Sequence, residues 1–325
     1  MNAYQLLIRV RFREFLRRLY RIDVVGADRI PASGPVILAR VAQATRRIEI
    51  GSCIFNPYTM NPGEIAAIAA TLDELSGNRF NLGLAAGAAD FLKWVGIPQP
   101  KPLTAMRETF DVVRRLLRGE RAPIAGEFLA WTDEAYLRFK PPRSTPIYLG
   151  AMGPKMLELA GELADGALPL LFPPEHYFAV KPLIEAGRAK RRADLGSPDV
   201  AACIWISLAE DRSAAERVLK EKIAYYGHAL SPLILGRLGL DRADFAPIER
   251  AMMAERDTDK AVGLVDARML RIGVVGEPKD VIARLEPLVA AGASHLSFGP
   301  PLGPIPLEAV RLLGQKVLPH FRKAP

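Results

Sequence analysis

The sequence predicts an α/β protein, and the expected architecture is a (β/α)8 barrel of the TIM type with insertions. Three observations favour this class. Short β-branched segments alternate with helical patterns over the whole chain. No linker-like or low-complexity segment interrupts the alternation. The 325 residues are also enough for one such barrel. We therefore expect a single domain over residues 1–325.

A strand–helix–strand unit between residues 47 and 87 is the clearest part of the pattern. A strand at 48–51 is followed by the turn at 56–63, a helix from Glu64 to about Gly77, and a strand at 79–84. Strands joined by a helical crossover are parallel neighbours, and α/β proteins place their chemistry in the loops at the carboxyl ends of such strands.

The remaining elements extend the same alternation. Further strands are expected near residues 24, 148, 168, 204 and 297, and helices over 35–45, 103–117, 154–163, 175–195, 213–226, 277–292 and 307–321. With the strands near 49 and 82 this makes seven, so the first strand of an eight-stranded barrel is missing or degenerate. Residues 88–102 are interpreted as a loop. Residues 120–145 are interpreted as an insertion that holds a hairpin with arms at 127–131 and 135–139.

The N-terminal 30 residues are basic and carry half of the net charge of +8. Residues 4–22 have an amphipathic helical pattern, with arginines on one face and apolar residues on the other. A membrane-surface or targeting helix is one interpretation. A barrel helix with a solvated outer face is the other, and we favour it.

Composition narrows the range of partners and compartments. The basic charge is not accompanied by a nucleic-acid motif, so we expect no nucleic-acid partner. No run of 18 apolar residues is present, so we expect no membrane span. The two cysteines, Cys53 and Cys203, are far apart and show no metal-ligand spacing, which predicts a reduced cytoplasmic protein without a metal site.

The turn from Gly150 to Lys155 has the features of a phosphate-binding site. Gly150 and Gly153 let the backbone approach a ligand, the following helix N-terminus favours an anion, and Lys155 adds a positive charge. A tight turn with no ligand is the alternative interpretation.

The segment 51–55 follows a strand with small residues and could line a flat aromatic cofactor, or be an ordinary loop. Asp28, Asp90, Glu64 and His295 are acid–base candidates because they lie at or near strand ends. From the residues alone, the prediction is a barrel that binds an anionic ligand.

The chain from about residue 35 to 321 resembles the bacterial luciferase-like superfamily, and within it the coenzyme F420-dependent methylenetetrahydromethanopterin reductases. The residues that carry the resemblance are RIEIG (47–51), NPYT (56–59), AATLDELSGNR (69–79) and YLGAMGPKMLELA (148–160). The resemblance implies a barrel, a homodimer, and F420 or a flavin at the carboxyl ends of the strands. It also implies direct hydride transfer between the cofactor and a small-molecule substrate.

The resemblance further implies roles for individual residues. The cofactor phosphate site would comprise Gly150, Ala151 and Gly153. A cis peptide bond between Cys53 and Ile54 would lie behind the deazaflavin ring. Asp28 or Asp90 would be a proton donor.

The sequence also departs from the family pattern near these positions. Ala88 stands where the family commonly has an acidic residue, and Arg29 replaces the usual histidine after Asp28. An FMN-dependent monooxygenase and a non-catalytic flavin-binding or partner-binding barrel are the alternatives to an F420-dependent oxidoreductase.

Overall fold

The strands of the main sheet are parallel because at least one helix separates each strand from the next along the chain. The computed structural model describes residues 35–230 and 232–322. Within these ranges the sheet has seven strands in the order β1-β2-β5-β6-β7-β8, and β9 also pairs with β7. The strands are β1 (Ile50–Gly51), β2 (Phe80–Leu84), β5 (Ile147–Ala151), β6 (Gly166–Pro169), β7 (Asp199–Leu208), β8 (Val274–Gly276) and β9 (His295–Leu302).

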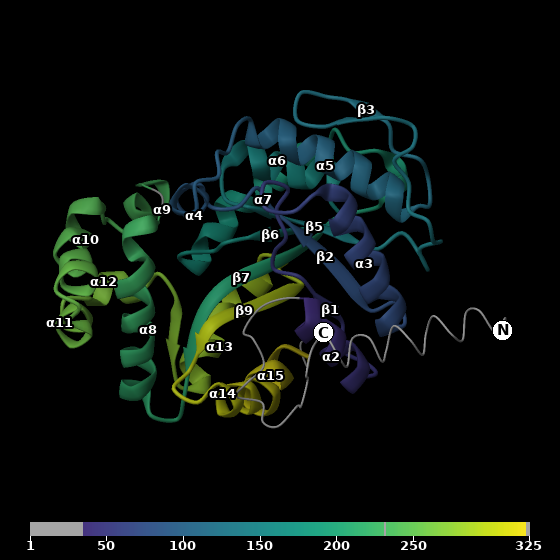
Figure 1. Ribbon diagram of the computed structural model, residues 1–325. Coiled ribbons are helices and arrows are strands. Elements are labelled where there is room, and N and C mark those ends of the chain that lie inside the picture. The colour runs from purple at the N-terminus through teal and green to yellow at the C-terminus, as the bar shows by residue number, and fades with distance from the viewer. Residues whose placement is uncertain (1–34, 231, 323–325) are drawn as a thin grey trace, which may run out of the picture.

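The sheet is curled, and Figure 1 shows helices α3, α5, α6 and α7 along its outer side. The helices are α2 (Pro35–Ala44), α3 (Pro62–Ser76), α4 (Ala89–Trp94), α5 (Pro102–Leu117), α6 (Pro154–Leu163), α7 (Tyr177–Arg188), α8 (Arg212–Tyr226), α9 (Pro232–Arg237), α10 (Arg242–Glu249), α11 (Thr258–Gly263), α12 (Ala267–Leu270), α13 (Pro278–Ala290), α14 (Pro306–Leu312) and α15 (Leu318–Arg322). Short π-helical segments follow α10 and α14, at Arg250–Ala254 and Leu313–Val317. No helix of residues 35–230 or 232–322 is long and apolar enough to cross a membrane.

Alternation along the strands separates a helix-covered face from a concave face. In β5, Ile147, Leu149 and Ala151 are buried, whereas the alternate residues Tyr148 and Gly150 are only partly buried. The main hydrophobic core lies between the covered face and the helices. A second core lies within α8–α12, which we call the helical lobe, and Figure 1 shows this lobe at one end of the molecule.

Helix α3 shows how the sequence sets the ends of the crossover between β1 and β2. The Asn61 side chain accepts a hydrogen bond from the Gly63 amide at 2.8 Å, and Pro62 occupies the first turn, where its missing N–H costs nothing. Gly77 ends the helix in the left-handed region at φ 67°. The predicted helix therefore differs from the observed one by two residues at its start.

The structure corrects the predicted hairpin. The insertion contains an antiparallel pair, but its strands are β3 (Ile124–Ala125) and β4 (Ala130–Trp131) rather than 127–131 and 135–139. The reason is Glu108, whose carboxylate accepts hydrogen bonds from the amides of Glu127, Phe128 and Leu129. These residues form the turn because their donors are bound by a side chain and not by a partner strand.

Two other assignments were wrong in detail. The loop predicted after Gly87 contains the short helix α4, which holds Asp90 in its first turn and buries Leu92. No strand was predicted between those near 204 and 297, but residues 274–276 form β8 against Ile206–Leu208 of β7. Both elements are too short for periodicity to reveal them.

The barrel prediction is supported only in its coarser form. The described residues form a parallel curled sheet with helices on its outer side, and a closed eight-stranded barrel is not established. The predicted helix at 4–22, the strand near 24 and Asp28 lie outside the described residues.

Candidate active site

A bulge interrupts the pairing of the first two strands at their carboxyl ends. Gly51 pairs with Asn81 and Phe55 pairs with Leu84, so the first segment has one residue more than the second between these points. The Ser52 hydroxyl occupies the interruption, where it accepts a hydrogen bond from the Gly83 amide at 2.9 Å and donates one to the Gly83 carbonyl at 3.1 Å. Ser52 thus replaces the missing strand hydrogen bonds.

Glycines on the neighbouring strands make room for this bulge. A Cβ atom on Gly83 would lie 2.1 Å from the Ser52 carbonyl oxygen. A Cβ atom on Gly150 would lie 3.1 Å from Ala85 Cβ and 3.6 Å from Ile54 Cγ2. The Ile54 side chain therefore lies on the concave face, close to the backbone of both β2 and β5.

The peptide bond between Cys53 and Ile54 is cis, as the resemblance implies. The Cys53 side chain is exposed, yet the protein packed around it raises the pKa of its thiol through desolvation. Burial also raises the pKa of the Cys203 thiol, to about 11. Both thiols are free, and their raised pKa values keep them protonated at neutral pH.

The turn after β5 leaves space for a ligand at the N-terminus of α6. Gly153 is the N-cap residue of this helix, no side chain caps it, and a Cβ atom there would have no neighbour within 4 Å. Ala151 is buried, whereas Met152, Gly153 and Lys155 are exposed. The open backbone, the helix N-terminus and the lysine fit a phosphate group.

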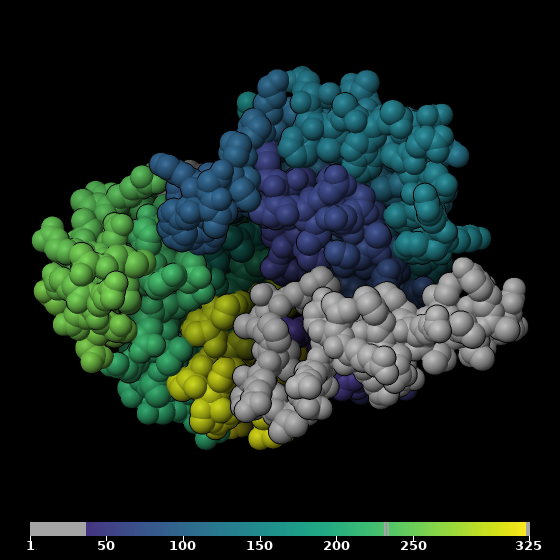
Figure 2. Space-filling view, viewed as in Figure 1, coloured from purple at the N-terminus to yellow at the C-terminus, as the bar shows by residue number. Residues whose placement is uncertain are grey.

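The predicted acid–base residues are not gathered at this edge. Asp90 is exposed in the first turn of α4, and Glu64 is exposed in the first turn of α3. Helix α4 nevertheless borders the bulge, because a Cβ atom on Gly87 would lie 3.4 Å from both Asn56 Nδ2 and Leu92 Cδ1. The recess between α4 and the C-terminal segment of the chain is visible in Figure 2.

His295 does lie at a strand end, but at the amino end of β9, the edge of the sheet opposite the bulge. It is the first residue of β9, and its Nδ1 atom lies 2.6 Å from Asp199 Oδ2, on the first residue of β7. The Tyr148 hydroxyl donates to the same carboxylate oxygen at 3.0 Å. The hydrogen bond between His295 and Asp199 raises the pKa of the histidine and lowers the pKa of the carboxylate. Desolvation raises the pKa of the Tyr148 hydroxyl. Sequence reasoning missed this cluster because its members are far apart in the chain.

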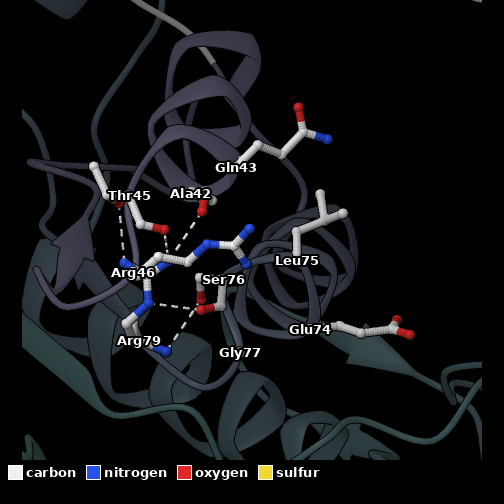
Figure 3. Close-up of a pocket in the computed structure, with 9 residues that line it drawn as sticks. All are labelled: Ala42, Gln43, Thr45, Arg46, Glu74, Leu75, Ser76, Gly77 and Arg79. Atoms are coloured by element: carbon white, nitrogen blue, oxygen red, sulfur yellow. Dashed lines mark hydrogen bonds between the residues drawn. The ribbon is translucent and has the colours of Figure 1, made fainter.

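A cavity of about 530 Å³ also lies on the amino-terminal side of the strands. Figure 3 shows that it lies between α2 and α3, with the Arg46 side chain extending across it. The Arg79 guanidinium beside it donates to the carbonyls of Ala42, Thr45 and Ser76 at 2.9, 3.0 and 2.7 Å. Arg79 therefore joins the carboxyl ends of the two helices, and we assign this region a structural role.

Comparisons with known proteins agree with the geometry at the carboxyl edge. The family model described as luciferase-like monooxygenase matches residues 21–295. The 5,10-methylenetetrahydromethanopterin reductase of Archaeoglobus fulgidus is 33% identical over 290 residues, which cover 88% of this chain and 87% of that protein. A putative coenzyme F420-dependent oxidoreductase of Mycobacterium tuberculosis is 29% identical over 261 residues, which cover 75% and 72%.

A solved structure gives the same result. The coenzyme F420-dependent tetrahydromethanopterin reductase of Methanopyrus kandleri superposes with a TM-score of 0.81 at 32% identity, and the match covers 89% of this chain and 88% of that one. The resemblance inferred from the four sequence segments is confirmed. The chain therefore belongs to the luciferase-like monooxygenase family.

Proposed function

We propose that this protein is an F420-dependent oxidoreductase similar to the methylenetetrahydromethanopterin reductases, which transfers a hydride between the deazaflavin and a small-molecule substrate. The observation that carries the proposal is the contact of the Cys53–Ile54 bulge with Gly150, the first residue of the turn that ends in Gly153. The bulge proposed to lie behind the deazaflavin ring and the turn proposed to bind phosphate are therefore neighbours on the concave face of the sheet. Coenzyme F420 is part of the names of the Mycobacterium tuberculosis relative and of the Methanopyrus kandleri structure.

The residues of this chain would bind and orient the cofactor. Gly150, Ala151 and Gly153 would hold its phosphate, and Lys155 would neutralise part of the charge. Cys53 and Ile54 provide the surface behind the ring. When bound, the reduced deazaflavin supplies the hydride.

Proton transfer to the substrate is assigned to an acidic side chain at the same edge. Asp90 is the described candidate, because α4 begins close to the bulge and presents this carboxyl group to solvent. Asp28 is the second candidate.

Titration of the purified protein with F420 and, separately, with FMN tests the proposal. Micromolar or tighter F420 binding, no FMN binding, and loss of F420 binding in Gly153→Val are the expected results. A preference for FMN would instead favour the flavin-dependent monooxygenase. F420 binding without hydride transfer to any reducible pterin-type substrate would favour a non-catalytic barrel.

The assembled protein is proposed to be a closed barrel and a homodimer in the cytoplasm, with no nucleic-acid partner. Closure would place a further strand beside β1, which pairs only with β2 among the described strands. The free thiols of Cys53 and Cys203 fit a reducing compartment. Light scattering coupled to size-exclusion chromatography tests the dimer, and a monomeric mass would contradict it.

A further inference from the structure

Lys222 of α8 lies against a group of aromatic rings at the carboxyl edge of the sheet. Its Nζ atom is 3.9 Å from the ring centroid of Tyr226 and 5.2 Å from that of Trp205. The Trp205 ring in turn lies 4.2 Å from the ring of Phe172, centroid to centroid, and 6.0 Å from that of Tyr226. We call Phe172, Trp205 and Tyr226 the aromatic cluster.

The charge of Lys222 has no carboxylate partner within residues 35–230 and 232–322. Desolvation alone lowers the pKa of Lys222, with no acidic side chain acting against it. Both arginines of the same helix are paired, Arg212 with Glu216 and Arg217 with Asp259. The neighbouring Glu221 lies 3.5 Å from Arg217. Lys222 is thus a half-buried ammonium group that faces rings and lacks an anion.

The aromatic cluster lies on the concave face, as the candidate cofactor site does. Trp205 faces Gly299, where a Cβ atom would lie 3.3 Å from the indole. Gly299 and His295 are four residues apart in β9, so they lie on the same face of the sheet. The His295 side chain meets Asp199, which also binds Tyr148, on the concave face.

Strand order also places the cluster near Gly150. β7 is two strands away from β5, so Trp205 is on the order of 10 Å from Gly150 across the sheet, plus its offset along the strand. Phe172 follows the carboxyl end of β6, the strand between them. A ligand that reaches from the bulge toward the helical lobe would meet the cluster.

We propose that Lys222 and the aromatic cluster bind the part of the substrate that carries an aromatic ring joined to a carboxylate. The half-buried rings of Trp205 and Tyr226 stack the aromatic part, and the ammonium group pairs with the carboxylate. The buried Phe172 supports Trp205 from behind. Partial burial strengthens this ion pair relative to one at the surface. The inference rests on the proposed function, because it assigns the substrate side of the same reaction edge.

Calorimetric titration of the full-length, cofactor-free protein with three probes tests the site. 2-Naphthoate has the ring and the carboxylate, 2-naphthamide has the ring without the charge, and cyclohexanecarboxylate has the charge without an aromatic ring. We expect 2-naphthoate to bind about tenfold more tightly than either of the other two. No binding of 2-naphthoate at millimolar concentration would overturn the proposal.

Substitutions on α8 separate the site from general effects. Lys222→Met should weaken 2-naphthoate binding about tenfold and leave 2-naphthamide binding unchanged, whereas Lys222→Arg should retain the binding. Lys220→Met is the matched control, because residues two apart on a helix point in different directions. Equal 2-naphthoate affinity in the wild type and in Lys222→Met would overturn the assignment. These titrations use the cofactor-free protein, so a negative result for 2-naphthoate is independent of the result of the F420 titration.

Discussion

The hydroxyl of Ser52 makes two hydrogen bonds to one residue, accepting from the amide and donating to the carbonyl of Gly83. This pairing holds the first strand segment in register on both sides of the bulge, since Phe55 resumes pairing by donating to the Gly83 carbonyl at 2.9 Å. The cis bond between Cys53 and Ile54 lies within the region so enclosed. The shape of the proposed ring site therefore depends on a glycine of the adjacent strand.

Replacing Gly83 with alanine tests this dependence. The added Cβ would meet the Ser52 carbonyl oxygen at 2.1 Å, so the bulge must shift. We expect a loss of about 1–3 kcal/mol in the free energy of unfolding, as for other overpacked interiors, measured by urea denaturation. F420 affinity should fall as well.

Gly236→Ala is the control for the alanine substitution, because a Cβ atom there has no neighbour within 4 Å. It should leave both quantities unchanged or raise stability slightly. Wild-type stability and F420 affinity in Gly83→Ala would show that the bulge does not need the close approach of the two backbones.

Gly150, near the end of β5, and Gly153, in the turn that follows, should respond differently to valine. Gly153→Val adds a side chain in open space, so stability should not change while the phosphate of F420 is excluded. Gly150→Val must displace Ala85 and Ile54, so it should reduce both stability and binding. Thermal denaturation and fluorescence titration of the two variants give the comparison. Unchanged F420 binding in Gly153→Val would remove this turn from the phosphate site.

Regular strands and helices could be predicted from the sequence, whereas features set by long-range contacts could not. Most of the order of strands and helices from 35 to 321 follows from periodicity, with α4 and β8 as exceptions, and the turn at Gly150–Lys155 follows from its glycines. Gly83 did carry a signal, because a glycine inside a strand indicates a bulge or a close backbone approach. The turn at 127–129 could not be found this way, since it is set by Glu108, some twenty residues earlier. Nor could the cluster of Tyr148, Asp199 and His295, which the sheet assembles from three strands.

The contact of His295 with Asp199 should make stability depend on pH. The pKa of His295 is raised in the folded state, so the contribution of the pair is fully present below the unfolded value of about 6.5 and is lost as the pH rises through the folded pKa. The pKa of Asp199 is lowered, so this carboxylate stays charged throughout that range. Stability supplied by the pair should therefore be larger at mildly acidic than at alkaline pH.

A double-mutant cycle with His295→Gln and Asp199→Asn, measured by urea unfolding at about pH 6 and pH 9, isolates this contribution. The coupling free energy should be favourable at the lower pH and smaller at the higher one. The same cycle on Arg107 and Glu162, which form two hydrogen bonds at 2.6 and 2.8 Å, is the control, because neither group titrates between these values. A coupling between His295 and Asp199 that is equal at both pH values would contradict a charged histidine.

Asp73 of α3 links the crossover helix to the strands that carry the proposed site. Its carboxylate is fully buried, and it accepts hydrogen bonds from the Phe80 amide at 3.1 Å, the Thr145 hydroxyl at 2.9 Å and Arg143 Nε at 2.8 Å. Phe80 begins β2 and Thr145 precedes β5, so one carboxylate fixes the starts of two adjacent strands. A buried charge of this kind depends on its cation.

Removing that cation should destabilise the fold without touching the carboxyl edge. Arg143→Met leaves the Asp73 carboxylate buried without its counter-ion, and we expect a loss of about 3 kcal/mol in the free energy of unfolding by urea denaturation. Arg138→Met, at an exposed position of the same connection, should change it little. F420 affinity of the folded fraction should be retained in both variants, because the contact lies at the amino ends of β2 and β5. Equal stability of the two variants would mean that the hydroxyl and the amide alone satisfy Asp73.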